Sequence, residues 1–428
     1  MKFGILFFII PCFSCGSQNK ETNATTSEEI VIHDTVRVGS TTSTDTKDIV
    51  IGAERFSAYF PLLKGKNIGL VANHTSVVHF AETIYPPNGE AISVEKEQHL
   101  VDLLLDNNFL LKKVFSPEHG FRGTADAGEF VKNGLDTKTD LPIISLYGKN
   151  KELHAEMLQG IDMMVFDIQD VGVRFYTYIS TLHYVMEACA EANIPLVILD
   201  RPNPNGHYID GPVLDIKYKS FLGMHPVPLV HGMTVGEFAQ MINGQRWLRH
   251  GGQCTLHIIE LLHYTHQTPY SVPVRPSPNL PNDVAINLYP SLGLLEGTNL
   301  NAGRGTEMQF QLIGSPYLPQ DKYPFSYTPQ PNFGSKSPKF NGVLCNGLDL
   351  RETPRMSRVD LTWIMDAYRN YEKKEAFFNT KNFTTHAGTE VLQQQIEQGY
   401  TFREIRATWL PDLKAYDQMR EKYLLYQR

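Results

Sequence analysis

A glutamate and a histidine stand side by side just after the short apolar run that ends in Val114 and Phe115. That run is typical of the end of a buried strand, and Pro117 prevents further backbone donation to a sheet. We therefore predict that Glu118 and His119 lie at the carboxyl end of a strand. A carboxyl and an imidazole at such a place are candidates for catalysis, although a polar loop whose glutamate caps a helix would read the same way.

The chain around this pair alternates apolar runs of strand length with helical stretches from Lys66 to about Asn203. Helices are predicted over residues 98–110 and 178–192, and in the second the apolar residues share one side. Alternation of this kind indicates a mainly parallel, doubly wound α/β sheet. The five predicted strands cover residues 67–72, 113–116, 142–146, 163–168 and 195–199.

Polar or reactive residues follow every one of these five strands. In open α/β sheets, ligands bind outside the carboxyl ends of the strands, so we predict that these residues share one cleft. In chain order they are Asn73-His74-Thr75, Glu118-His119, Tyr147-Gly148, the segment 167–174 with Asp167, Asp170 and Arg174, and Asp200-Arg201-Pro202-Asn203.

Several classes of protein and cofactor are disfavoured. The first strand is followed by NHTS rather than GxGxxG, and no GxxxxGK[ST] occurs, so we expect no nucleotide cofactor. A net charge of −7 without a Lys/Arg cluster predicts no binding to nucleic acid. Cys189, Cys254 and Cys345 have neither CxxC nor paired spacing, so neither a zinc site nor a disulfide framework is expected.

The N-terminus resembles a bacterial lipoprotein signal peptide. Its apolar run, residues 3–13, is too short for a bilayer, which needs roughly 20 residues, and it ends in Ser14-Cys15-Gly16. Cys12 stands where leucine is usual in that motif, and the alternative is ordinary secretion with cleavage nearby. We expect a signal peptide over residues 1–15, lipidation of Cys15 and a flexible tether over 16–50. We also expect the protein in the cell envelope, periplasmic or on the outer membrane, with the lipid as its only contact with the membrane.

The pattern changes after Gly206. Thr234 and Glu237 form a capping box that predicts a helix over 235–247. Residues 268–346 are rich in proline, glycine and asparagine and contain two polar islands, at 275–279 and 295–307. Helices are expected at about 360–371 and 389–398, and the last residues, 416–426, are expected to dock on the body. We predict a Rossmann-like catalytic domain over 51–220 and a smaller α+β C-terminal domain over 221–428 that completes the cleft.

Eight segments occur in a fixed order along the chain: SPEHGFRG, SLYG, FDIQDVGVRFYTY, LDRPNPNG, HGMTVGE, PSPNLP, EGTN and GRGTE. Together they resemble the exo-β-N-acetylmuramidases, a bacterial family formerly called a domain of unknown function. The similarity runs from about Lys64 to Arg428. The resemblance implies a Rossmann-like domain followed by a smaller one, an exo-acting glycoside hydrolase that releases terminal N-acetylmuramic acid from peptidoglycan, and a catalytic role for the glutamate of PEHG, here Glu118.

Cleavage of a glycosidic bond needs a protonated carboxyl that donates to the leaving oxygen, and usually a second carboxylate. Glu118 is our candidate for the acid, because burial or a neighbouring carboxylate would favour its protonated form, and His119 could tune it or position water. For the second carboxylate we rank Asp170 first, followed by Asp167, Glu296 and Glu307.

Muramic acid also carries a lactyl carboxylate, which suits an arginine. Each arginine candidate could instead form a structural ion pair with a nearby aspartate. The candidates for this contact are Arg122, Arg174, Arg201 and Arg304, and the further candidates for sugar binding are Asn73, His74, Asp200, Asn203, His231, Glu296, Asn299 and Glu307.

Two alternatives stay open. A metal-dependent hydrolase could use His119, Asp167, Asp170 and Asp200, although no tight ligand motif such as HExxH is present. A lipoprotein without catalytic activity could bind peptidoglycan fragments and deliver them to a transporter.

Overall fold

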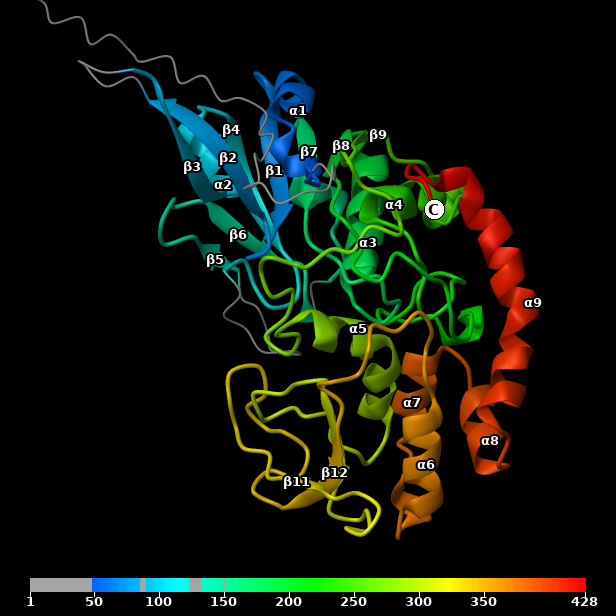
Figure 1. Ribbon diagram of the computed structural model, residues 1–428. Helices are drawn as coiled ribbons and strands as arrows, with labels where there is room; N and C mark the ends of the chain where they lie inside the picture. The colour runs from blue at the N-terminus through cyan, green and yellow to red at the C-terminus, as the bar shows by residue number, and fades with distance from the viewer. Residues whose placement is uncertain (1–47, 85–89, 123–132, 149–150) are drawn as a thin grey trace, which may run out of the picture. The chain divides into compact units, whose positions relative to one another are not determined.

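The computed structural model describes residues 48–84, 90–122, 133–148 and 151–428 (Figure 1). The predicted signal segment, the lipidation candidate Cys15 and nearly all of the predicted tether lie outside these residues. No helix in the described part of the chain is both long and apolar enough to cross a membrane.

Seven strands form the central sheet in the order β5-β6-β4-β1-β7-β8-β9. Six of them are parallel, and only β5 at the edge runs antiparallel to its neighbour. Numbered along the chain, the parallel strands follow the order 3-2-1-4-5-6, which is that of the Rossmann fold. The predicted fold class is confirmed. The strands are β1 (Asn67–Ala72), β4 (Leu110–Ser116), β5 (Gly134–Leu135), β6 (Pro142–Ser145), β7 (Met163–Asp167), β8 (Leu196–Leu199) and β9 (Leu256–Ile259).

Helices cover both faces of this sheet. Because successive strand residues point to opposite faces, Leu70 of β1 packs in one core with α1 (Phe56–Leu63) and α2 (Leu100–Asp106). Val71 packs in the other core with α3 (Tyr178–Ala192) and α4 (Val235–Gly244). The faces are therefore built by alternating apolar residues of the strands.

Some predicted boundaries are wrong. Residues 98–110 are not one helix: α2 begins after His99, whose side chain accepts from Val101 N, and it ends at Asp106 because β4 starts at Leu110. The helix α4 ends at Gly244, before Trp247. The predicted α3 has the observed bounds.

An antiparallel hairpin that the sequence pattern did not indicate precedes α2. It consists of β2 (Val77–Ile84) and β3 (Ile92–His99), paired from Val77 with His99 to Ile84 with Ile92. Most residues of β3 are exposed or half-buried, so the strand lacks the apolar run that marks the buried strands.

The C-terminal part combines a small antiparallel sheet with helices (Figure 1). The sheet has the order β10-β12-β11, with β10 (Leu312–Ser315), β11 (Phe325–Tyr327) and β12 (Cys345–Asp349). The helices are α5 (Asp283–Leu292), α6 (Thr362–Asn370), α7 (Thr380–Ala387), α8 (Val391–Glu397) and α9 (Phe402–Arg420). Short 3-10 turns occur at Gly52–Glu54, Ala155–Leu158, Ile216–Tyr218, Arg249–Gly251, Gly293–Gly297, Lys374–Ala376 and Glu421–Tyr423.

The last residues dock on the Rossmann-like part. The Tyr426 hydroxyl donates to Asp200 Oδ2 at 2.7 Å, just beyond β8. The backbone N–H groups of Leu425 and Tyr426 donate to Glu237 Oε1, in the first turn of α4. The C-terminal segment therefore holds two polar side chains that would otherwise be buried without these donors.

Candidate active site

A cavity of about 270 Å³ lies beyond the carboxyl end of β4. Its lining comes from the segments that follow four strands of the large sheet, β4, β6, β7 and β8, and from four segments further along the chain. The lining residues are Glu118, His119, Tyr147, Phe175, Tyr176, Thr177, Leu222, Ser277, Asn279, Leu280, Tyr289, Glu296, Arg304, Phe310 and His386.

Two hydroxyl groups contact Glu118. Thr177 Oγ1 donates to Glu118 Oε2 at 2.8 Å. Burial, the negative charge of Glu118 and a hydrogen bond to it raise the pKa of Tyr147, so this phenol keeps its proton. The carboxyl group is therefore held between residues that follow β6 and precede α3.

The backbone turns sharply after Glu118. His119 has φ +71°, and Gly120 has φ +76°, so two successive residues adopt the left-handed conformation. This conformation is uncommon for a residue other than glycine and is a mark of strain at functional sites. His119 is only 4% exposed and lines the cavity beside Glu118.

A second carboxylate, Glu296, lies in the lining contributed by the C-terminal half. Arg304 Nη1 donates to Glu296 Oε1 at 3.2 Å. Burial alone would raise the pKa of Glu296, but the positive charges of Arg304 and Lys339 outweigh it and lower this pKa. Burial and the charges of Glu296 and Glu118 raise the pKa of Tyr289, so this phenol is within electrostatic reach of both carboxylates.

The imidazole of His386 has a defined proton position. Its Nδ1 lies 2.9 Å from the Asn382 carbonyl oxygen, which can only accept, so Nδ1 carries the proton. Burial lowers the pKa of His386, which favours the neutral ring with Nε2 as an acceptor. The cavity thus combines two carboxylates, an arginine and a neutral histidine.

Residues 68–284 match the N-terminal family model of the exo-β-N-acetylmuramidase NamZ, and residues 287–426 match its C-terminal model. The chain belongs to the exo-β-N-acetylmuramidase family. It is 37% identical over 387 residues to the peptidoglycan β-N-acetylmuramidase NamZ of Bacillus subtilis strain 168, a match that covers 86% of this chain and 89% of that protein.

Two crystal structures of DUF1343 family proteins from Bacteroides fragilis have the same fold. One is 42% identical with a TM-score of 0.77, and the other is 26% identical with a TM-score of 0.73. Each match covers 89% of this chain and 99% of the other. The family resemblance noted in the sequence is therefore confirmed.

Four of the predicted site residues of this exo-β-N-acetylmuramidase family member line the cavity: Glu118, His119, Glu296 and Arg304. Asp170, ranked first as second carboxylate, does not line it. Its Oδ2 accepts from Gly172 N at 2.7 Å and lies 3.8 Å from His231 Nε2. His231 Nδ1 in turn accepts from Met233 N.

Residues at the switch point of the sheet, between β1 and β7, bond to one another. Arg201 makes a two-pronged contact with Asp167, from Nε to Oδ1 at 2.5 Å and from Nη2 to Oδ2 at 3.0 Å. Ser76 donates to the Asp167 carbonyl, and the Asn73 side chain accepts from Thr75. These buried side chains occupy the place where ligands bind in other doubly wound sheets.

Asp200 and Asn203, at the end of β8, are also engaged within the protein. Asp200 accepts hydrogen bonds from the Thr234 and Tyr426 hydroxyls and from Gly236 N. Asn203 donates to the Met233 carbonyl and accepts from Asn205 N, as in an Asx turn. Neither residue lines the cavity.

Two arginine candidates also have partners within the protein. Arg174 is fully buried and donates to four backbone carbonyls, those of Pro212, Val227, His386 and Ala387. Arg122 pairs with Asp136, from Nε to Oδ1 at 3.2 Å and from Nη2 to Oδ2 at 2.8 Å.

Three other binding candidates lie outside the cavity lining. His74 Nε2 is 2.7 Å from the Arg275 carbonyl, and burial lowers the pKa of His74 to about 4. Asn299 is half-buried and accepts at its carbonyl from the Tyr371 hydroxyl, and Glu307 is exposed.

Other cavity residues were not named as site candidates from the sequence. Tyr147 follows a predicted strand, and Ser277 and Asn279 belong to a polar island. These positions in the sequence could therefore have indicated all three as site residues. Tyr289 and His386 lie in helices, and nothing in their local sequence separates them from structural residues. Among the described residues, no three His, Cys, Asp or Glu side chains are placed to hold a metal ion.

Proposed function

We propose that this protein is an exo-acting glycoside hydrolase that removes terminal N-acetylmuramic acid from peptidoglycan fragments, with Glu118 as the general acid. The assignment of Glu118 as the acid rests on its place in the cavity. Glu118 lines this cavity together with a second carboxylate, and it accepts a hydrogen bond from the Thr177 hydroxyl. Family membership supports the reaction and the substrate class.

Glu118 donates its proton to the glycosidic oxygen as the bond to the leaving sugar breaks. The Thr177 and Tyr147 hydroxyls stabilise the carboxylate that forms, because both are donors already in place before the reaction. The same two contacts fix the direction in which the carboxyl group points.

Glu296 is our choice for the second carboxylate. Arg304 and Lys339 favour its ionised form, which suits a group that stabilises positive charge on the sugar or activates water. Asp170 and Asp167 are less suited, because neither lines the cavity and Asp167 is bound to Arg201 on both oxygens.

Arg304 recognises the lactyl carboxylate of muramic acid in this scheme. It is the one arginine among the four candidates that lines the cavity, and its buried Nε has no hydrogen-bond partner among the described residues. A guanidinium with an unused donor matches a carboxylate that arrives with the substrate.

The test is release of chromophore from a chromogenic β-N-acetylmuramide by wild type, Glu118→Gln and the control Glu352→Gln, in which an exposed glutamate is changed. We expect full activity in the control and a loss of about 10²–10⁴-fold in Glu118→Gln. If wild type releases nothing from this substrate or from muramic acid–terminated fragments, the muramidase proposal is wrong and the alternative of a non-catalytic binding protein is favoured. Equal rates in all three proteins would remove Glu118 from the mechanism.

We also infer that the protein is anchored to the cell envelope through lipid on Cys15, which would place the cavity outside the cytoplasm. The support is the apolar run followed by Ser14-Cys15-Gly16. Fractionation of cells that express wild type or Cys15→Ala tests it. Wild type should be in the membrane fraction and the variant should be released, whereas release of both would contradict lipidation.

A further inference from the structure

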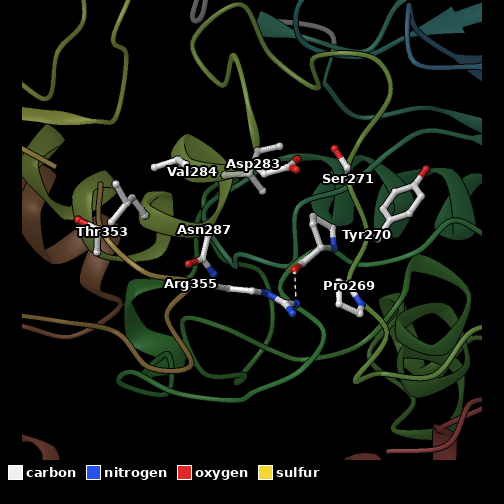
Figure 2. A pocket seen from close by; sticks show the side chains of 11 residues that line it. Pro269, Tyr270, Ser271, Asp283, Val284, Asn287, Thr353 and Arg355 are labelled. Atoms are coloured by element: carbon white, nitrogen blue, oxygen red, sulfur yellow. Dashed lines mark hydrogen bonds between the residues drawn. The ribbon is translucent and has the colours of Figure 1, made fainter. Parts of the chain in front are cut away.

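A second cavity, of about 360 Å³, adjoins another part of α5 (Figure 2). It shares no lining residue with the active-site cavity. The helix α5 contributes Asp283, Val284, Asn287 and two further residues to this cavity and Tyr289 to the active site, so one helix forms part of both walls. The other lining residues are Pro204, Pro269, Tyr270, Ser271, Ile286, Leu288, Thr353 and Arg355.

The cavity contains one positive and one negative side chain that do not pair with each other. Arg355 uses only Nη2, which lies 3.0 Å from His207 Nδ1 and 3.4 Å from the Pro204 carbonyl oxygen. Its Nε and Nη1 make no hydrogen bond to the described residues. The Asp283 carboxylate likewise has neither a hydrogen bond nor an ion pair with any described residue. Figure 2 shows Asp283 set apart from the guanidinium of Arg355.

The direction of the Arg355 side chain is fixed by a supporting histidine. His207 Nε2 donates to the Met356 carbonyl oxygen at 2.9 Å, which leaves His207 Nδ1 as the acceptor for Arg355. Burial lowers the pKa of His207, so the ring is neutral and compatible with the guanidinium beside it. Arg355 is thus held on one edge while its other N–H groups stay available to a ligand.

Apolar surface completes the cavity. Ile286 and Leu288 are buried, and Val284 is half-buried beside them. Pro204, Pro269 and the ring of Tyr270 add further apolar surface. A ligand for this site therefore has hydrocarbon between groups of opposite charge.

We propose that this cavity binds a short zwitterionic peptide, with its carboxylate on Arg355, its ammonium group on Asp283 and its small side chains against Val284 and Leu288. Arg355 and Asp283 are both exposed, so water solvates them in the empty cavity. A neutral sugar would form an ion pair with neither side chain, and an acidic sugar would form one only with Arg355, whereas a zwitterion can pair with both. Peptides are the zwitterionic component of peptidoglycan fragments. The natural source of the ligand therefore rests on the proposed function, whereas the binding chemistry rests on the cavity alone.

Calorimetric titration with alanyl-alanine tests the proposal, together with its N-acetylated and C-amidated forms, which each lack one charge. Wild type should bind the free dipeptide most tightly. Arg355→Ala should weaken the free and N-acetylated peptides by about tenfold or more. Asp283→Asn should weaken only peptides with a free ammonium group. Controls are Arg351→Ala and Asp321→Asn, which change exposed charges outside the cavity lining.

No binding of the free dipeptide by wild type at about 10 mM would overturn the proposal. Equal binding by wild type and Arg355→Ala would do the same. Tighter binding of N-acetylmuramic acid than of dipeptide, dependent on Arg355 and independent of Asp283, would identify an acidic-sugar site instead. None of these titrations measures turnover, so their failure leaves the muramidase proposal intact, and failure of the muramide assay leaves peptide binding intact.

Discussion

Thr177 stands at the N-cap of α3, yet its hydroxyl makes no capping bond to that helix and instead donates to Glu118 Oε2 at 2.8 Å. The contact joins the start of α3, which follows β7, to the loop after β4. The position of the candidate acid therefore depends on how α3 packs on the sheet, where most residues of α3 are buried.

Substitution of Thr177 by Val is expected to lower kcat by about tenfold, the equivalent of about 1.4 kcal/mol, and to leave KM nearly unchanged. The valine keeps the shape of the side chain but removes the donor to Glu118. Because the hydroxyl caps nothing, the stability of the protein should hardly change. Steady-state hydrolysis of a chromogenic muramide measures this effect. Thr181→Val, which removes a hydroxyl one turn further along α3, is the control and should retain wild-type kcat.

Arg304→Lys is expected to lower kcat/KM for a muramide by about 10–100-fold, since lysine keeps the charge next to Glu296 but loses the two-pronged contact with a carboxylate. A β-N-acetylglucosaminide lacks the lactyl group, so whatever rate it shows should be unchanged. The ratio of the two kcat/KM values is the measurement. If kcat/KM fell by the same factor for both substrates, Arg304 would act only through Glu296.

The strand pattern and the polar strand ends could be read from the sequence because buried parallel strands leave continuous apolar runs. This predicted the order of elements around Glu118. The hairpin of β2 and β3 escaped prediction because β2 is largely half-buried and β3 is largely exposed, so neither has such a run. The strand β9 was missed because only one of its four residues is fully buried.

The strand-end rule places residues at one edge of the sheet but does not say which of them pair with each other. Asp167 and Arg201 both follow that rule, and they bind each other rather than facing the cavity. Glu296 and Arg304 come from a loop more than a hundred residues beyond Glu118, so only the fold brings them to the same cavity. The neutral state of His386 depends on its burial, and its tautomer depends on the contact of Nδ1 with Asn382, so neither could be inferred from residue type.

Dialysis against EDTA is expected to leave muramide hydrolysis unchanged. Of the four residues that a metal-dependent mechanism would use, only His119 lines the cavity. Asp167 is bound by Arg201, and Asp200 by the hydroxyls of Thr234 and Tyr426. Loss of turnover that returns when a divalent metal is added would instead establish the metal-dependent alternative.

Arg174→Lys is expected to lower the free energy of unfolding by about 3 kcal/mol. Burial lowers the pKa of Arg174 to about 9, but the group remains charged at neutral pH and satisfies four carbonyls that lysine cannot reach together. The same substitution at Arg122, whose side chain is 34% exposed, should cost less than about 1 kcal/mol. Urea denaturation of both variants measures the difference, and equal costs would contradict a structural role for the buried guanidinium.

Tyr426→Phe is expected to destabilise the protein more at pH 8 than at pH 4.5. Burial raises the pKa of Asp200 to about 6, against hydrogen bonds from Thr234, Gly236 and Tyr426 that favour the ionised form. Because this folded-state pKa exceeds the unfolded value of about 3.9, the folded protein holds the proton more tightly between these values. The free energy of unfolding therefore falls as pH rises from about 4 to 6.

Above that window Asp200 is ionised and depends most on the Tyr426 hydroxyl, which donates to it at 2.7 Å. Loss of this donor should cost about 2 kcal/mol at pH 8 and about 1 kcal/mol at pH 4.5, where the carboxyl is largely protonated. Urea denaturation at the two pH values measures both costs. Tyr423→Phe is the matched control, because that hydroxyl accepts from Gln245 and has no acidic partner among the described residues, so its cost should not change with pH. Equal costs of Tyr426→Phe at both pH values would show that the docked C-terminus does not stabilise the charge on Asp200.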